Sequence, residues 1–83
     1  IPEQERLLSA GCTCFALLQA AQSLGFGASW LTGWPAYDDD VRALLGLSAH
    51  ERVLGFVHIG TPTAAIEDRD RPRLEDVVSR WQG

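Results

Sequence analysis

The chain has 83 residues, of which 46% are hydrophobic and 22% charged, and its net charge is −4 at neutral pH. This balance is typical of a globular protein, and no apolar run approaches the roughly 20 residues of a transmembrane helix. The acidic charge argues against a general nucleic-acid surface, which needs clustered positive charge. We therefore expect neither a nucleic-acid partner nor a membrane partner.

The first predicted element is a long helix from about Glu3 to Leu24. Pro2 suits its first turn, and early acidic residues favour the positive end of the helix dipole. Gly25 is a natural stop, with Phe26 available for the hydrophobic contact that follows such a glycine. Helical spacing predicts a single apolar stripe, made of Ala10, Cys14, Leu17, Leu18, Ala21 and Leu24.

Cys12 and Cys14 are the only cysteines. Two positions apart on a helix, their side chains point about 200° apart, so they cannot pair with each other or converge on one metal ion. We expect two small, buried apolar residues. A reducing, cytoplasmic setting fits two unpaired cysteines.

A short strand is predicted from Ala28 to Leu31. Both of its faces carry apolar or small residues, as in a central strand of a sheet covered on both sides. Pro35 ends this region, because proline lacks an amide donor and pushes Trp34 out of the helical conformation.

Three consecutive aspartates, Asp38, Asp39 and Asp40, precede an apolar run over residues 41–47. They predict a short helix with one aspartate as its N-cap and further negative charge in its first turn, ending near Gly46. Clustered carboxylates also bind hard cations. Capping explains the run without a metal, so no metal site is assigned.

The clearest strand pattern runs from Arg52 to Ile59, and both of its alternating sets are largely apolar. An irregular charged segment follows, and Arg73 to Trp81 has the apolar spacing of a short C-terminal helix. Two covered strands do not make a viable sheet alone. We therefore expect the partner strands to come from sequence absent from this chain or from another subunit.

No nucleophile elbow, P-loop, zinc-ligand spacing or dinucleotide fingerprint occurs, so no catalytic residue is assigned. Trp30 and Trp34 flank Leu31-Thr32-Gly33. Core packing with a strand-ending turn is one interpretation. The other is a wall of backbone and aromatic groups against a flat ring, since glycine lets a ligand approach backbone amides closely.

Arg69, Arg71 and Arg73 lie beyond the last predicted strand, among acidic residues. They form either a solvated charged tail or a phosphate contact, for which the planar arginine fork is effective. Both interpretations remain open for Arg69 and Arg71.

Several short motifs occur together in a single order along the first three-quarters of the chain. They are Ser9-Ala10-Gly11-Cys12, Gln19-Ala20-Ala21, Gly25-Phe26-Gly27, Trp30-Leu31-Thr32-Gly33, residues 41–47 and residues 53–62. In this order and spacing they resemble the C-terminal half of a bacterial FMN-dependent NAD(P)H nitroreductase, within the compact short-chain subgroup.

The resemblance implies an α+β fold in which residues 1–83 are the C-terminal portion of a single domain, with the sheet completed by an absent N-terminal half. It also implies a homodimer with FMN in clefts at the subunit interface. It implies that Trp30, Leu31 and Thr32 line the flavin largely through backbone groups, next to Gly33, and that the end of the long helix borders the bound NAD(P)H. The residues expected on that NAD(P)H side are Ala20, Ala21, Gln22, Ser23, Leu24 and Gly25. Many relatives carry arginine where this chain has Leu31.

The implied activity is ping-pong hydride transfer from NAD(P)H to a nitroaromatic or quinone, in which the flavin carries out the chemistry. This explains the absence of a visible acid–base pair. An alternative from a different class is a non-catalytic association module whose flavin pocket has decayed.

Overall fold

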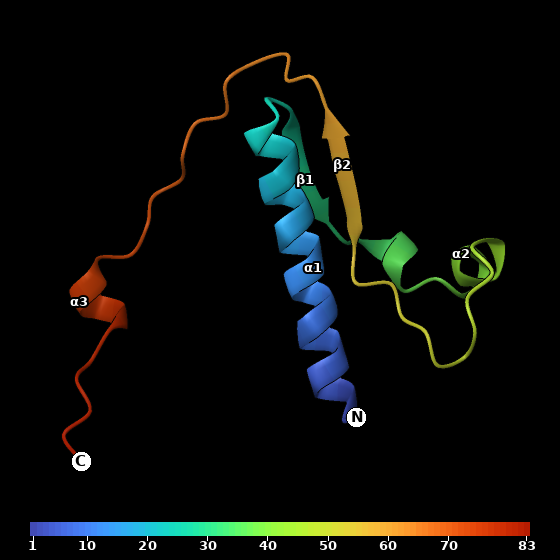
Figure 1. The fold of residues 1–83 in the computed structure, drawn as a ribbon, viewed down its shortest axis with the longest axis horizontal. Helices are drawn as coiled ribbons and strands as arrows, with labels where there is room; N and C mark the ends of the chain where they lie inside the picture. The colour runs from blue at the N-terminus through green and yellow to red at the C-terminus, as the bar shows by residue number, and fades with distance from the viewer.

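The computed structural model describes all 83 residues (Figure 1). One long helix lies against a two-stranded sheet. Three short helical segments lie outside this helix–sheet body, the last of them in the C-terminal tail. The elements in chain order are α1 (Glu3–Ser23), β1 (Gly27–Leu31), the 3-10 helix η1 (Trp34–Ala36), α2 (Asp39–Leu44), β2 (Phe56–Gly60) and α3 (Leu74–Val77). This mixture of helix and sheet is consistent with the predicted α+β class.

The end of α1 confirms the predicted glycine stop. Gly25 has φ +90°, a conformation that glycine adopts without steric cost. Its N–H donates to Gln22 O at 3.0 Å, and the Phe26 N–H donates to Ala21 O at 3.0 Å. These two bonds form a Schellman motif, which satisfies carbonyls at the helix end and turns the chain into β1.

β1 and β2 pair in antiparallel register, with Gly27 opposite Gly60 and Leu31 opposite Phe56. The helix α1 runs alongside this pair (Figure 1). Because side chains alternate along a strand, Trp30 and its cross-strand partner Val57 share the face that α1 covers. The opposite face is open, so the expectation of strands covered on both sides is wrong for this chain by itself. No strand or helix here lies over that second face.

The face of α1 toward the sheet differs from the predicted stripe. Ala10, Leu17 and Leu24 are exposed, and the helix presents a neighbouring row to the strands. The helix positions that are buried or half-buried are Leu7, Gly11, Cys14, Leu18 and Ala21. We attribute this change of face to Trp30, whose indole packs against Gly11. A Cβ atom at Gly11 would lie 3.6 Å from the Cη2 atom of Trp30. The large indole therefore sits over the smallest residue of the helix.

Neither cysteine is deeply buried. Cys12 is exposed and Cys14 is half-buried, and both are free thiols. The prediction that both are buried apolar residues is therefore wrong, because only the Cys14 position faces the sheet.

The predicted strand over 52–59 begins only at Phe56, and the chain before it is irregular. The cause is the Trp30 indole, whose Nε1–H donates to Leu54 O at 3.0 Å. The Leu54 carbonyl therefore accepts a hydrogen bond from a side chain and not from a neighbouring strand. Gly55 then adopts φ +152° and passes directly beside the indole ring. Backbone pairing with β1 therefore begins only at Phe56, after the chain has passed the indole ring.

The short helix α2 confirms the capping prediction. Asp38 has extended backbone angles, and its Oδ1 accepts the Asp40 N–H at 3.1 Å. At the other end, Gly46 has φ +73°, and the Leu47 N–H donates to Arg42 O at 3.0 Å. The carboxylates of the aspartate run therefore act in helix capping and at the positive end of the helix dipole.

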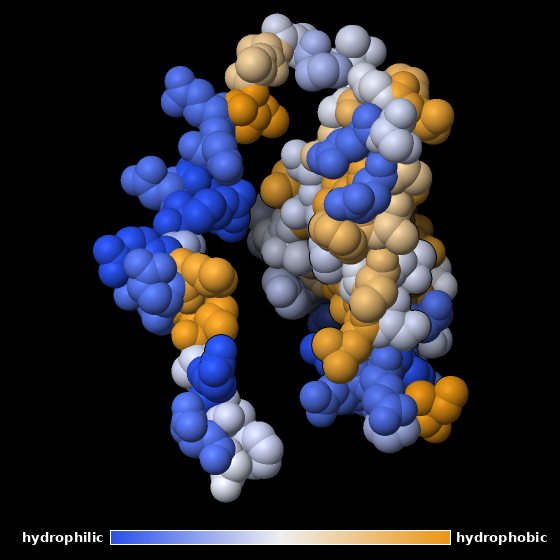
Figure 2. Space-filling view, turned by 60° about the vertical axis from the view of Figure 1, so that its left-hand side comes forward, coloured by the Kyte–Doolittle hydropathy of each residue, from blue (hydrophilic) through white to orange (hydrophobic).

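The C-terminal helix is much shorter than the predicted 73–81. It spans Leu74–Val77, and Val78 already has extended angles. Its apolar side chains contact no core: Leu74 is 71% exposed and Trp81 is 88% exposed. Short helices gain most of their stability from tertiary packing, which is missing here. In Figure 2 this tail stands apart from the helix–sheet body.

The chain buries very little by itself. Only Ala21 and Ala36 are more than nine-tenths buried, while many large apolar side chains are half or more exposed. No helix combines the length and the apolar character needed to cross a membrane.

Glu51 closes the loop that leads from α2 toward β2. Its Oε1 accepts the Ser48 N–H at 2.9 Å. This backbone hydrogen bond, the Ser48 hydroxyl and the charge of Arg42 hold the pKa of the Glu51 carboxyl below its ordinary value of 4.5.

A lowered pKa in the folded state means that the ionised Glu51 carboxylate stabilises the fold. We expect this contribution to be complete above pH 4.5 and to disappear as the pH falls through the lower, folded-state value. Urea unfolding of the native protein and of Glu51→Gln at several pH values tests this. The difference in unfolding free energy should shrink toward acid pH, and a constant difference from pH 7 to pH 3 would contradict the assignment.

Candidate functional site

The stretch Trp30–Gly33 connects the end of β1 to η1. Its first two side chains point to opposite faces of the sheet: Trp30 toward α1, and Leu31 toward the open face, where it is 53% exposed. The Trp30 indole is fixed by its hydrogen bond to Leu54 O. Any ligand at the open face of this stretch therefore meets its backbone and the Leu31 side chain. The Trp30 ring lies on the opposite face, between the strand and α1.

The backbone after β1 offers free donors. The N–H groups of Thr32, Gly33 and Trp34 donate no hydrogen bond to any protein acceptor, and all three residues are exposed. Backbone N–H groups are strong donors that normally find a partner. Three consecutive free ones at a strand end can bind the acceptor edge of a planar heterocycle.

Gly33 has φ +112° and ψ −174°. Residues with a side chain rarely adopt this region, which is essentially reserved for glycine. A Cβ there would meet only Pro35 Cδ, at 3.7 Å, so the surrounding space is open. This position therefore keeps the adjacent backbone accessible from outside.

The residues expected on the NAD(P)H side lie at the other end of β1. Ala21 is 5% exposed and packs against the sheet, so its side chain is not available to a ligand. Gln22, Ser23 and Leu24 are exposed, although the Ser23 hydroxyl donates to Ala20 O at 2.8 Å. Five residues of strand, about 17 Å, separate this group from Thr32. Within one chain, the two predicted groups do not meet.

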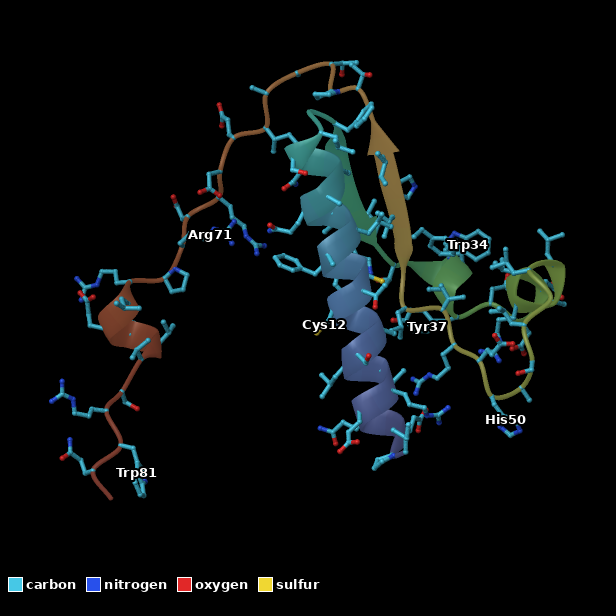
Figure 3. All side chains as sticks on the ribbon, in the orientation of Figure 1. Cys12, Trp34, Tyr37, His50, Arg71 and Trp81 are labelled. Carbon is cyan, nitrogen blue, oxygen red and sulfur yellow. The ribbon has the colours of Figure 1, made fainter.

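Arg69 and Arg71 are exposed residues of the tail. Arg71 Nη2 forms an ion pair with Asp68 Oδ1 at 3.1 Å. Figure 3 shows Arg71 on the opposite side of α1 from Trp34. The structure therefore does not bring these arginines to the Trp30–Gly33 stretch of the same chain.

Sequence reasoning missed a small cavity of about 230 Å³ beside Thr32. It lies between the end of β1, η1, α2 and the irregular segment before β2, and it contains two arginines. Arg42 and Arg52 are far apart in the sequence, so no local motif marks them. Gly55 was also missed as a structural determinant, although a glycine inside a strand pattern often marks close backbone approach.

Comparison with known proteins gives a match to one family. A family model described as "Nitroreductase family" matches residues 1–61 of the chain.

The chain belongs to the nitroreductase family.

Two relatives of this family illustrate the match. The protein named "Putative NAD(P)H nitroreductase YdjA" of Escherichia coli (strain K12) is 36% identical over 62 residues, which is 75% of this chain and 34% of the relative. The protein named "Putative NAD(P)H nitroreductase" of Haemophilus influenzae is 38% identical over 61 residues, which is 74% of this chain and 33% of the relative. The chain thus spans about a third of the length of these relatives.

The family match contains the whole helix–sheet body. It ends at residue 61, directly after β2, and so includes Trp30–Gly33, η1 and α2. The tail with Arg69 and Arg71 lies outside the matched residues. The predicted family is confirmed, and the roles of individual residues stay predictions.

Proposed function

We propose that this chain is the C-terminal portion of an FMN-dependent oxidoreductase that uses NAD(P)H to reduce nitroaromatics or quinones. The observation that carries the proposal is the nitroreductase family match over residues 1–61. Both relatives are named as NAD(P)H nitroreductases, which supports the oxidoreductase class. When bound, FMN supplies the hydride chemistry, and the protein orients and shields it.

Residues Trp30 to Gly33 are the proposed flavin-binding stretch. The free N–H groups of Thr32 and Gly33 would donate to the oxygen and nitrogen acceptors of the flavin ring. Leu31, half-exposed on the open face of the sheet, would present an apolar surface to the ring. Trp30 would hold this wall in place through Leu54, so the donors are positioned before the ligand arrives.

We propose a homodimer as the working form. An apolar groove of about 580 Å³ runs along α1 beside Trp30. Leu8 and Phe15 at this groove are 62% and 55% exposed in this chain, so they offer apolar surface that a second protomer would cover. The groove is lined by Leu7, Leu8, Gly11, Cys12, Phe15, Trp30 and Leu54.

The separation of the two predicted cofactor groups also supports a dimer. A nicotinamide must reach the flavin for hydride transfer, yet residues 20–25 and Thr32 lie at opposite ends of β1. A second protomer could place its own residues 20–25 beside the flavin of the first. In this arrangement each site is complete only in the dimer.

Sedimentation equilibrium of the full-length protein and of a Leu8→Glu, Phe15→Glu variant tests this assembly. The native protein should be a dimer, and the variant should dissociate and lose bound flavin together. If the variant remained a dimer despite both introduced charges, the α1 groove would not be part of the interface. The free thiols fit the proposed cytoplasmic setting.

A further inference from the structure

The open face of the sheet presents a short series of residues that begins beside the proposed flavin stretch. Because side chains alternate along a strand, every second residue of β1 and of β2 belongs to this face. No aspartate, glutamate, lysine or arginine is among these residues, so the face has no permanently charged side chain. The cross-strand pairs, counted from the flavin stretch, are Leu31 and Phe56, Ser29 and His58, and Gly27 and Gly60.

The pair nearest the flavin stretch is apolar. Leu31 is 53% exposed and Phe56 is half-buried. Side chains directly opposite each other in an antiparallel pair have Cβ atoms about 4.5–5.5 Å apart, so these two form one continuous apolar surface. Leu31 directly precedes Thr32, whose N–H group is free. This surface therefore borders any ligand that the free backbone donors hold.

The arginines closest to the flavin stretch are held away from this face. Arg52 forms an ion pair with Glu3 of α1 at 2.8 Å, which draws its guanidinium group toward the side of the sheet that α1 covers. Arg42 Nη2 donates to Ser48 O at 3.0 Å in the loop after α2. Neither arginine therefore offers a positive charge to a ligand that lies over Leu31.

We propose that Leu31 and Phe56 make this site selective for neutral aromatic acceptors over anionic ones. The inference rests on the proposed function, because an acceptor must lie against the flavin to receive a hydride, and its outer edge would then cover the apolar pair. A neutral substituent loses little when water is removed from it there. A carboxylate loses its hydration without gaining a charged partner, which is costly.

Ligand-observed NMR titration of the full-length, oxidised protein tests the proposal with acetophenone and benzoate. The two probes have nearly the same size and shape, differ by one negative charge, and contain no nitro or quinone group. A pH of 8 keeps ordinary histidines neutral. Acetophenone should bind about fivefold or more tightly than benzoate. Leu31→Arg should bring the ratio of the two affinities to about one or invert it, because the arginine fork pairs with a carboxylate.

Two further variants keep the test decisive. Leu45→Arg is the matched control, because Leu45 is 52% exposed and lies at the end of α2, away from the sheet. It adds the same charge and should leave the ratio unchanged. His58→Lys adds a positive charge to an exposed residue of the open face, diagonal to Leu31, and should lower the ratio about twofold or more. This change decides the matter if Leu31→Arg fails to fold.

Equal affinity of the native protein for the two probes would overturn the proposal. A ratio that neither Leu31→Arg nor His58→Lys alters would also overturn it, as would an equal change in Leu45→Arg. The absorbance of bound flavin is recorded on the same samples. A protein that contains flavin but shows no preference overturns this inference alone. A protein without flavin whose preference still depends on Leu31 refutes the proposed function and leaves this apolar surface as an aromatic-binding site.

Discussion

Replacing Gly55 by alanine should destabilise the protein by about 3–5 kcal/mol, because overpacking and backbone strain act at the same position. The added Cβ would run into the Trp30 indole ring and would lie 2.9 Å from Leu31 O. The φ of +152° also disfavours any side chain there. The indole cannot move aside without losing its hydrogen bond to Leu54 O. Urea unfolding of the full-length protein measures the loss.

Gly60→Ala is the matched control for this variant. Gly60 lies at the far end of β2, and a Cβ there would meet no atom within 4 Å. We expect a change in unfolding free energy of less than about 0.5 kcal/mol. If the two glycine variants proved equally stable, Trp30 would not be fixed against the backbone at Gly55, and the explanation for the late start of β2 would be wrong.

Replacing Gly33 by valine should reduce the flavin content of the purified protein to near zero. The substitution places a branched side chain beside the free N–H groups of Thr32 and Trp34, and it forces the backbone out of a conformation that only glycine adopts readily. Both effects remove the donors from the position that the flavin ring would use. Absorbance at the flavin band relative to the protein band gives the occupancy.

Two variants separate loss of the site from loss of the fold. Gly46→Val introduces comparable backbone strain at the end of α2, where a Cβ would meet no atom within 4 Å, and it should keep its flavin. Leu31→Ala removes a side chain but no backbone donor, and it should retain most of its flavin. Full flavin occupancy in Gly33→Val would show that the pocket lies elsewhere.

Local chemistry made much of the fold predictable. The glycine stop of α1 at Gly25, the cap at Asp38 and the end of α2 near Gly46 each depend on residues within one helical turn. The bounds of α1 and β1 are correct to within one residue for the same reason. Such signals require no knowledge of what packs against the element.

The errors arose where a distant residue decides the local structure. Residues 52–55 have a strand pattern, but the Trp30 indole, 24 positions earlier than Leu54, binds the carbonyl there and bends the chain. The tail from Arg73 to Trp81 has a helical pattern, but nothing packs against it beyond one turn. The apolar stripe of α1 was misplaced because its position depends on which helix residue receives that indole.

The candidate site was predictable as a stretch but not in its detail. Two tryptophans around Leu31-Thr32-Gly33 drew attention to the end of β1. The sequence did not show that Trp30 turns its side chain toward α1, or that the following N–H groups are free. The arginine cavity was invisible because Arg42 and Arg52 converge only through the loop between them.

The most direct test of the central proposal is the visible absorption spectrum of the purified full-length protein, recorded anaerobically before and after addition of NADH or NADPH. We expect a flavin band that bleaches on addition of the reduced nicotinamide and returns when a nitroaromatic or a quinone is added. A protein that is colourless as purified and stays colourless after incubation with FMN would contradict this account, and the family membership would then describe the ancestry of the fold alone.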